Sequence, residues 1–262
     1  MTAATTTPQV RTLPKFGGFS LGMIKLEFRR MMRNRRTVVF TFIMPAVLFL
    51  LFGSNAGAKT EQVGGGNLAG YLLVSMAVYG AMLATTSGGA MVSVERAAGW
   101  SRQLRLTPLR PLAYIAIKLV LAMTIGLVSV AVAFAVGSVS GAKLPVHAWI
   151  ECGLLAWICA LVFAAFGLFM GYLLPSENVM QILGPVLGVL SFAGGLFVPV
   201  EQLGHTFATI AKFTPVYGVG EIARYPLTHD GDLWLAALNV IAWTAIFAAG
   251  AMWRFRRDTA RV

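Results

Sequence analysis

Charged side chains are scarce in this sequence of 262 residues, where Lys, Arg, Asp and Glu together make up 12%. A soluble domain carries about twice that share, so the composition excludes an ordinary soluble fold. Hydrophobic residues make up 57%. They gather in six long apolar runs: Val38–Gly53, Leu68–Val92, Leu112–Val139, Trp149–Leu174, Val179–Val198 and Leu233–Trp253.

The apolar runs have the length that a membrane requires. A helix rises about 1.5 Å per residue, so roughly 20 residues cross a hydrocarbon core of about 30 Å, and only the first run is at the short end of that range. Backbone amides in lipid must pair within their own segment, which makes each run a helix. We therefore expect an all-α membrane protein with six transmembrane helices in one domain (residues 37–262), after a disordered cytoplasmic leader (1–17) and an interfacial helix (18–36).

Acidic residues are the scarcer charge, at 10 against 21 Lys and Arg, which gives a formal net charge of +11. The basic residues cluster before the first run, between the second and third runs, and after the last. Lys and Arg beside a span are retained in the cytoplasm. The excess therefore predicts that both termini and the second-to-third connection are cytoplasmic, and it does not indicate nucleic-acid binding.

Residues with catalytic or metal-binding chemistry are few. The two cysteines, Cys152 and Cys159, lie seven apart on one apolar run, a spacing typical of packing. The three histidines show no ligand spacing, and we find no Ser/His/Asp set or paired carboxylates, so no catalytic or metal residue is predicted. Gly53–Thr60 differs by one residue from a P-loop but follows an apolar run where a P-loop follows a strand, so we do not interpret it as a nucleotide site.

The segment before the first run is amphipathic. Leu21, Ile24, Phe28 and Met31 fall on one helical arc, with Lys25 and neighbouring arginines pointing away. Such a helix lies along the inner leaflet with its basic side chains among anionic headgroups. The alternative is a helix that packs on its own bundle.

The Val94–Pro111 connection contains the sharpest motif. It can form a short helix that Pro108 ends. Trp100 and Leu104 lie one turn apart on a single face, which suits insertion into a partner's groove. The alternative is that Trp100 anchors at the headgroup level.

The fifth run carries small residues at helical spacing, Gly184, Gly188, Ser191, Gly194 and Gly195, with Phe192 as a candidate cavity residue. Small faces let helices approach closely in lipid. The stripe is either a dimer seam that encloses the substrate path or a contact within one bundle. The following stretch, Glu201–Arg224, is broken by prolines and glycines. It predicts a pair of short helices that dip into the outer leaflet.

Two of these segments resemble the type-2 permeases of ATP-binding cassette exporters, the family that includes the daunorubicin-resistance permeases. The family's second-to-third-span loop is matched by Glu95, Arg96, Gly99, Leu104, Thr107, Pro108 and Leu109. Its fifth-to-sixth-span connection is matched by Gly195–Pro199, Leu203, Pro215 and Arg224. The chain departs from the family at Ala97, Ala98 and Arg102, where acidic residues are usual, and at Gly204, where proline is common.

The resemblance implies a transport subunit without a nucleotide site of its own. The 94–108 loop would be the coupling helix that docks on a separate ATPase subunit, present in two copies, which binds the ATP and Mg. Trp100 and Leu104 would be buried anchors, and the rim would hold Glu95, Arg96, Arg102 and Arg105. A second permease copy or a similar permease would complete the complex.

By the same resemblance, the complex would export hydrophobic or amphipathic small molecules, such as a drug, antibiotic or lipid-like compound, through a bacterial plasma membrane. An ion-coupled secondary transporter is one alternative. It would need buried ionisable residues near mid-membrane, and the interiors of the runs carry essentially none. A non-transporting structural membrane subunit is the other alternative.

Overall fold

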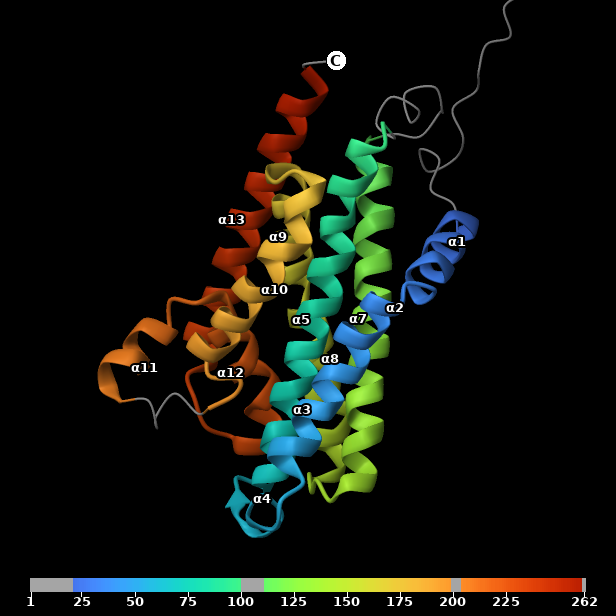
Figure 1. The fold of residues 1–262 in the computed structure, drawn as a ribbon. Coiled ribbons are helices and arrows are strands. Elements are labelled where there is room, and N and C mark those ends of the chain that lie inside the picture. The colour runs from blue at the N-terminus through green and yellow to red at the C-terminus, as the bar shows by residue number, and fades with distance from the viewer. Residues whose placement is uncertain (1–20, 100–110, 199–203, 261–262) are drawn as a thin grey trace, which may run out of the picture.

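The structure is a computed structural model that describes residues 21–99, 111–198 and 204–260. This part of the chain is mostly helical and contains one short β-hairpin (Figure 1). In chain order its elements are α1 (Leu21–Met32), α2 (Arg35–Val38), the π-helix η2 (Val39–Ile43), α3 (Met44–Gly53), α4 (Ala56–Thr60), β1 (Gln62–Val63), β2 (Gly66–Asn67), α5 (Leu68–Ala97), α7 (Pro111–Ser140), α8 (Val146–Cys159), α9 (Leu161–Leu173), α10 (Ser176–Ala193), α11 (His205–Ala211), α12 (Pro215–Thr228) and α13 (Leu233–Ala260).

Four helices among the described residues are long and apolar enough to cross a membrane: Leu68–Ala97, Ala113–Ser140, Val146–Leu173 and Leu233–Arg257. They confirm the second, third, fourth and sixth predicted runs as long apolar helices. The first run forms a shorter apolar helix over Val39–Gly53. The fifth forms α10, which begins with polar residues, ends before the predicted Val198, and is not among the four.

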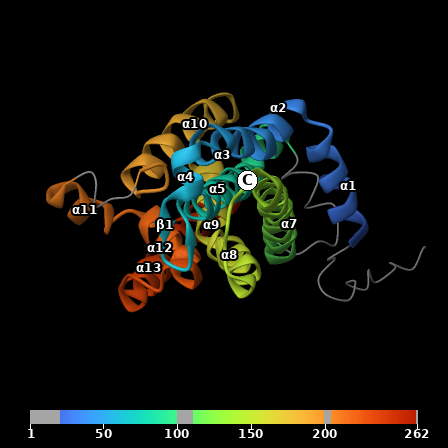
Figure 2. The same ribbon diagram turned by 90° about the horizontal axis from the view of Figure 1, so that it is seen from below.

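Helix α5 lies at the centre of the bundle. In Figure 2, which looks along the long helices, α3, α7, α8, α9 and α10 surround it. Glycines set the close spacing: a Cβ on Gly88 would lie 2.8 Å from Cα of Ala122, and one on Gly167 would lie 2.2 Å from the carbonyl oxygen of Thr86. A side chain at either position would collide with a neighbouring backbone, so α7 and α9 pack on α5 only because these residues are small.

Pro45 alters the first apolar run in a way that its hydropathy does not indicate. Pro45 has no N–H, so the carbonyl of Thr41 loses the donor that a regular α-helix would give it. The backbone adopts π-helical geometry over η2, and the Ser129 hydroxyl of α7 donates to the Thr41 carbonyl at 2.8 Å. The freed carbonyl is therefore satisfied inside the bundle, as an apolar environment requires.

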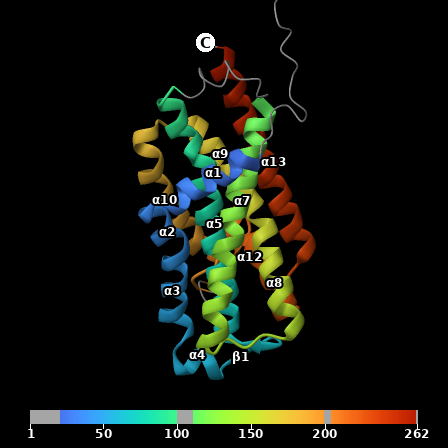
Figure 3. The same ribbon diagram turned by 90° about the vertical axis from the view of Figure 1, so that its right-hand side faces the viewer.

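Helix α1 crosses the long helices at a steep angle, as Figures 2 and 3 show. Met31 is buried and Phe28 is partly buried, in a cluster with Phe42 and Leu121. Lys25, on the other side of the helix, is exposed. The apolar side of α1 thus packs on the bundle of its own chain, which is one of the two interpretations that the sequence leaves open.

We call the end of the molecule that carries α4, β1 and β2 the hairpin end (Figure 1). Asn67, which is fully buried, joins three segments there. Its Oδ1 accepts from the N–H groups of Gly70 and Lys143, each at 2.9 Å. Its Nδ2 donates to the carbonyls of Lys59 and Gly141, each at 3.1 Å. One side chain therefore caps α5 and fixes α4 to the α7–α8 connection.

Replacing Asn67 by alanine should destabilise the hairpin end. We expect Asn67→Ala to lower the free energy of unfolding by about 3 kcal/mol, because buried polar groups left without partners cost about 1–3 kcal/mol each. Thermal unfolding followed by tryptophan fluorescence in detergent measures the change. Asn55→Ala is the matched control: Asn55 is an exposed N-cap with only local bonds in α3 and α4, worth about 1 kcal/mol. Equal losses for both variants would contradict the role given to Asn67.

Candidate functional site

The structure describes part of the predicted coupling segment. Trp100, Arg102, Leu104, Arg105, Thr107 and Pro108 lie outside the described residues. Glu95 and Arg96 belong to the last turns of α5, which continues to Ala97. The sequence placed them at the start of a separate short helix, and this placement is corrected. The long central helix runs into the motif without a break.

Glu95 is the centre of a buried ionic cluster. Its side chain is 5% exposed and accepts hydrogen bonds from the Tyr114 hydroxyl and the Lys118 ammonium group of α7. Tyr114 and Lys118 are four residues apart, so they lie on one face of α7. Lys118 is 1% exposed and also lies 3.3 Å from Oε2 of Glu27 in α1. We call Glu27, Glu95, Tyr114 and Lys118 the Lys118 cluster.

The Lys118 cluster fixes three helices to one another. Lys118 supplies one positive charge between two carboxylates, and Arg30 lies 3.9 Å from Glu27 at the more exposed side. Breaking a buried ion pair by removing one partner costs about 3–5 kcal/mol, because the remaining charge has no water to solvate it. The middle of α1, the C-terminal end of α5 and the early turns of α7 are therefore held together at the entrance to the predicted coupling loop.

Arg96 points into the bundle as well. Its Nη1 donates to the carbonyls of Gly171 and Tyr172, both at 3.1 Å, and its guanidinium group lies over the Tyr172 ring at 5.5 Å. These carbonyls end α9 and have no intrahelical donor, so a cation there is favourable. Glu95 and Arg96, which the family resemblance assigns to the rim of a partner contact, are thus both engaged by the bundle of their own chain.

Gly99 ends α5 by its backbone conformation. Its φ is +71°, and its N–H donates to the Arg96 carbonyl at 3.0 Å. A Cβ built at this position meets nothing within 4 Å, so space is not the constraint. A left-handed residue after the last turn of a helix is usually glycine. The glycine of the motif therefore turns the chain out of α5.

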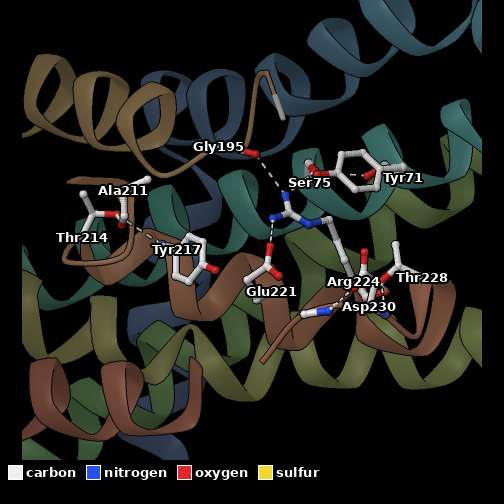
Figure 4. Close-up of polar contacts among 11 residues, drawn as sticks. Tyr71, Ser75, Gly195, Ala211, Thr214, Tyr217, Glu221, Arg224, Thr228 and Asp230 are labelled. Atoms are coloured by element: carbon white, nitrogen blue, oxygen red, sulfur yellow. Dashed lines mark hydrogen bonds and ion pairs between the residues drawn. The ribbon is translucent and has the colours of Figure 1, made fainter. Parts of the chain in front are cut away.

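A second polar cluster surrounds Arg224, which the sequence singled out only through the family resemblance. Figure 4 shows its side chain reaching from α12 toward α5 and the turn after α10. Arg224 is 3% exposed. Its Nη2 lies 2.8 Å from Oε1 of Glu221, and its Nη1 donates to the Gly195 carbonyl at 3.0 Å and to the Ser75 hydroxyl at 3.3 Å. The guanidinium group also lies over the Tyr71 ring at 4.8 Å.

Local sequence explains how α12 presents Arg224. Thr214 caps the helix by accepting from the Tyr217 N–H at 3.3 Å, and Pro215 occupies the first helical position. Glu221 and Arg224 are three residues apart, which places them side by side on one face. A Cβ on Gly218 would lie 2.6 Å from the Ala236 carbonyl oxygen of α13. Close packing on α13 thus holds α12 in position.

The small-residue stripe of α10 divides into two faces. A Cβ on Gly184 or Gly188 would meet nothing within 4 Å, and Phe192 is 45% exposed. Ser191 and Gly195 are buried, and Ser191 donates to the Leu187 carbonyl at 2.7 Å. Of these residues, Gly184, Gly188 and Phe192 therefore face away from the bundle, whereas Ser191 and Gly195 pack inside it.

Sequence reasoning missed Glu27, Tyr114 and Lys118, and it also missed the partners of Arg224. One signal was available, since Lys118 lies inside the run Leu112–Val139, where a charge needs a partner. His147 and His229, which are distant in sequence, have ring centroids 6.4 Å apart. Across the described part of the chain, no group of three or more His, Cys, Asp or Glu residues is placed to hold a metal ion.

Comparison with known proteins places this geometry in a family. Residues 21–227 match the family model described as ABC-2 type transporter. The chain is also 27% identical over 226 residues to the Bacillus subtilis (strain 168) protein named "Putative transport permease YvfS", and the match covers 84% of this chain and 90% of that protein. Five helices lie in or beside the two polar clusters. The matched residues cover α1, α5, α7 and α10 in full and most of α12. The match covers most of the chain and includes both polar clusters, so the chain belongs to the ABC-2 type transporter family.

Proposed function

We propose that this chain is the permease subunit of an ATP-driven exporter that moves hydrophobic or amphipathic small molecules out of the cell. The observation that supports this proposal most directly is the Lys118 cluster. It contains Glu95, at the start of the 94–108 segment that the family resemblance assigns to ATPase docking, and it ties α5 to α7 and α1. A displacement of the loop is therefore delivered to three helices as one unit.

The proposed topology has six spans, with the Val39–Gly53 helix and α10 added to the four longest helices. Arg254, Arg256 and Arg257 lie near the C-terminal end of α13, whereas Lys59 and Lys143 lie at the hairpin end. Basic residues favour the cytoplasm, so both termini are cytoplasmic in a bacterial plasma membrane. The steep crossing of α1, with Lys25 exposed, suits a helix at the inner leaflet.

The pairing of buried charges favours an ATP-driven exporter over an ion-coupled transporter. In the described residues, the buried side chains of Asp, Glu, Lys and Arg type are Glu95, Lys118 and Arg224, and each takes part in an ion pair. Proton or sodium coupling needs an ionisable group that gains and loses its ion during the cycle. Side chains already neutralised by fixed partners are poor candidates for that role.

Energy would come from two copies of a separate ATPase subunit, which bind the ATP and Mg. Trp100 and Leu104 are the proposed anchors of this contact, and Arg102 and Arg105 remain the proposed rim residues. Glu95 and Arg96 act from inside, by holding the loop entrance in place. Docking and transmission are therefore assigned to different residues, which makes them separable by mutation.

Docking should depend on the two anchors. We expect Trp100→Ala and Leu104→Ala each to weaken binding of the ATPase by about 30-fold, because truncating a buried interface anchor costs about 2 kcal/mol or more. Co-purification from membranes and titration in nanodiscs measure the loss. Trp234→Ala, which removes an 80% exposed tryptophan from the start of α13, is the control and should bind normally. Unchanged binding in the Trp100/Leu104 double variant would contradict this docking contact.

Transmission should depend on the Lys118 cluster. We expect the double variant Lys118→Met/Glu95→Gln to bind the ATPase normally but to transport about tenfold less substrate per ATP hydrolysed. The pair of substitutions removes both buried charges together, and Glu27, which loses Lys118, keeps Arg30 at 3.9 Å, so no charge of the cluster is left without a partner. Reconstituted vesicles give both rates. Lys143→Met, which alters an exposed lysine, is the control. Normal coupling in the double variant would exclude the cluster as the link.

A second permease copy, or a similar permease, is proposed to pack on the outward face of α10, with the substrate path beside it. Gly184 and Gly188 leave open space above the backbone there, and Phe192 is exposed next to them. Glycines at this spacing let two helix backbones approach closely in lipid. Ser191 and Gly195 are excluded from the seam because they are buried within their own chain.

A bulky side chain on that face should weaken the dimer without disturbing the fold. We expect Gly184→Leu to reduce dimer affinity by about tenfold, since lost backbone contact between transmembrane helices is worth about 1–2 kcal/mol. Single-molecule photobleaching in nanodiscs counts the subunits. Ala131→Leu, on an exposed position of α7, is the size-matched control. A Gly184→Leu protein as dimeric as the control would place the seam elsewhere.

A further inference from the structure

We propose that Arg224 is the latch of the substrate exit: it holds the end of α10 against α12 and α5, and substrate leaves when these bonds open. This inference rests on the proposed export function and assigns a positioning role within it. Arg224 is a suitable residue because its guanidinium group contacts three segments at once, as Figure 4 shows.

The positions of the partners of Arg224 suit a contact that opens and closes. Glu221, a charged partner of Arg224, lies on the same helix, three residues earlier. The Gly195 carbonyl, the Ser75 hydroxyl and the Tyr71 ring, which Arg224 contacts on other segments, are neutral. If α12 moves away from α10, the Glu221 carboxylate moves with Arg224 and the ion pair is kept. The bonds to Gly195 and Ser75 break instead, and bonds to neutral groups are the weaker ones.

The end of α10 is built to offer an acceptor. The N–H of Gly195 bonds to the Phe192 carbonyl at 3.2 Å, and the N–H of Leu196 bonds to the Ser191 carbonyl at 3.0 Å. With Gly195 at φ +77°, this pattern is a Schellman turn. The turn ends α10 at a glycine whose carbonyl receives the guanidinium group. Arg224 therefore binds α10 at its last turn, where a helix end can move most.

The contacts behind the latch are apolar and lack directional bonds. Leu196 and Val216 are almost fully buried, and a Cβ on Gly194 would lie 2.5 Å from the Val216 side chain. On the α5 side of this turn, the Tyr79 and Phe197 rings meet edge to face at 5.1 Å. An apolar seam between the end of α10 and α12 reseals after an apolar molecule passes, because its contacts need no particular partner.

The variant Arg224→Lys tests whether the bridging guanidinium group is required or whether a buried positive charge is enough. Lysine keeps the charge and its pairing with Glu221, but its single nitrogen does not reproduce the fork that bridges Gly195, Ser75 and Glu221. A charge needed only for folding is thus retained in the variant, whereas the bridge is lost. Ser75→Ala provides a milder second test, because it removes one neutral partner and leaves the ion pair intact.

The experiment measures access to the last turn of α10. In a Cys152→Ala/Cys159→Ala background, Ser191→Cys places one small thiol at a fully buried position. A membrane-impermeant maleimide added to intact cells then reports opening from outside. We expect Arg224→Lys to be labelled about tenfold faster than the parent, and Ser75→Ala about threefold faster. Arg254→Lys, at the other end of the bundle, should be labelled at the parent rate.

Labelling of Arg224→Lys at the parent rate, with an unchanged unfolding midpoint, would overturn the latch. If that variant does not reach the membrane, Ser75→Ala decides by the same criterion. The proposed function is tested separately by adding the ATPase subunit, ATP and vanadate to vesicles. If nucleotide drives the opening, it should raise the labelling rate of the parent strongly and that of Arg224→Lys only slightly. Loss of all nucleotide dependence would contradict the exporter, whereas the basal difference between parent and Arg224→Lys would still support the latch.

Discussion

A charge buried among apolar helices must have a partner at hydrogen-bond distance, and this constraint organises both polar clusters of the molecule. Lys118 finds its carboxylates on two other helices, so its pairs join α7 to α5 and α1. Arg224 pairs with Glu221 on its own helix, so this ion pair does not join two helices. The first arrangement resists separation, because pulling the helices apart would leave charges unsolvated. The second pair is kept when α12 moves, because both of its members move together.

Between the two clusters the helices are held by shape. Glycines at Gly88 and Gly167 bring α7 and α9 onto α5 at backbone contact. Packing of this kind is strong only while the surfaces match, and it transmits rigid displacement along α5. The hydroxyl of Ser129 also holds two helices together, because it donates a hydrogen bond to the carbonyl that Pro45 leaves free in the first apolar run. These polar groups inside the bundle thus either bond to a free backbone carbonyl or neutralise a charge.

The sequence predicted what depends on local composition. Long apolar runs became long helices because hydropathy and length are properties of the run itself. The end of α5 at Gly99 was not predicted, because the motif favours a short helix that continues to Pro108. The direction in which a side chain points was harder to predict. Glu95 and Arg96 looked like rim residues, because nothing in their neighbourhood reveals that Lys118 and the end of α9 would meet them in space. The split of the α10 stripe was equally hidden, since small residues favour close approach without stating which helix approaches.

These features favour displacement of α10. Its outward face carries Gly184 and Gly188 above open space, its final turn is joined to α12 through a neutral carbonyl, and its contacts with α12 are apolar. The helices joined by the Lys118 cluster have no comparable freedom. In the proposed cycle, force that enters at the end of α5 therefore moves α1, α5 and α7 as a group, and the relative motion appears where the bonding is weakest. That place is the seam between α10 and α12, which Arg224 spans.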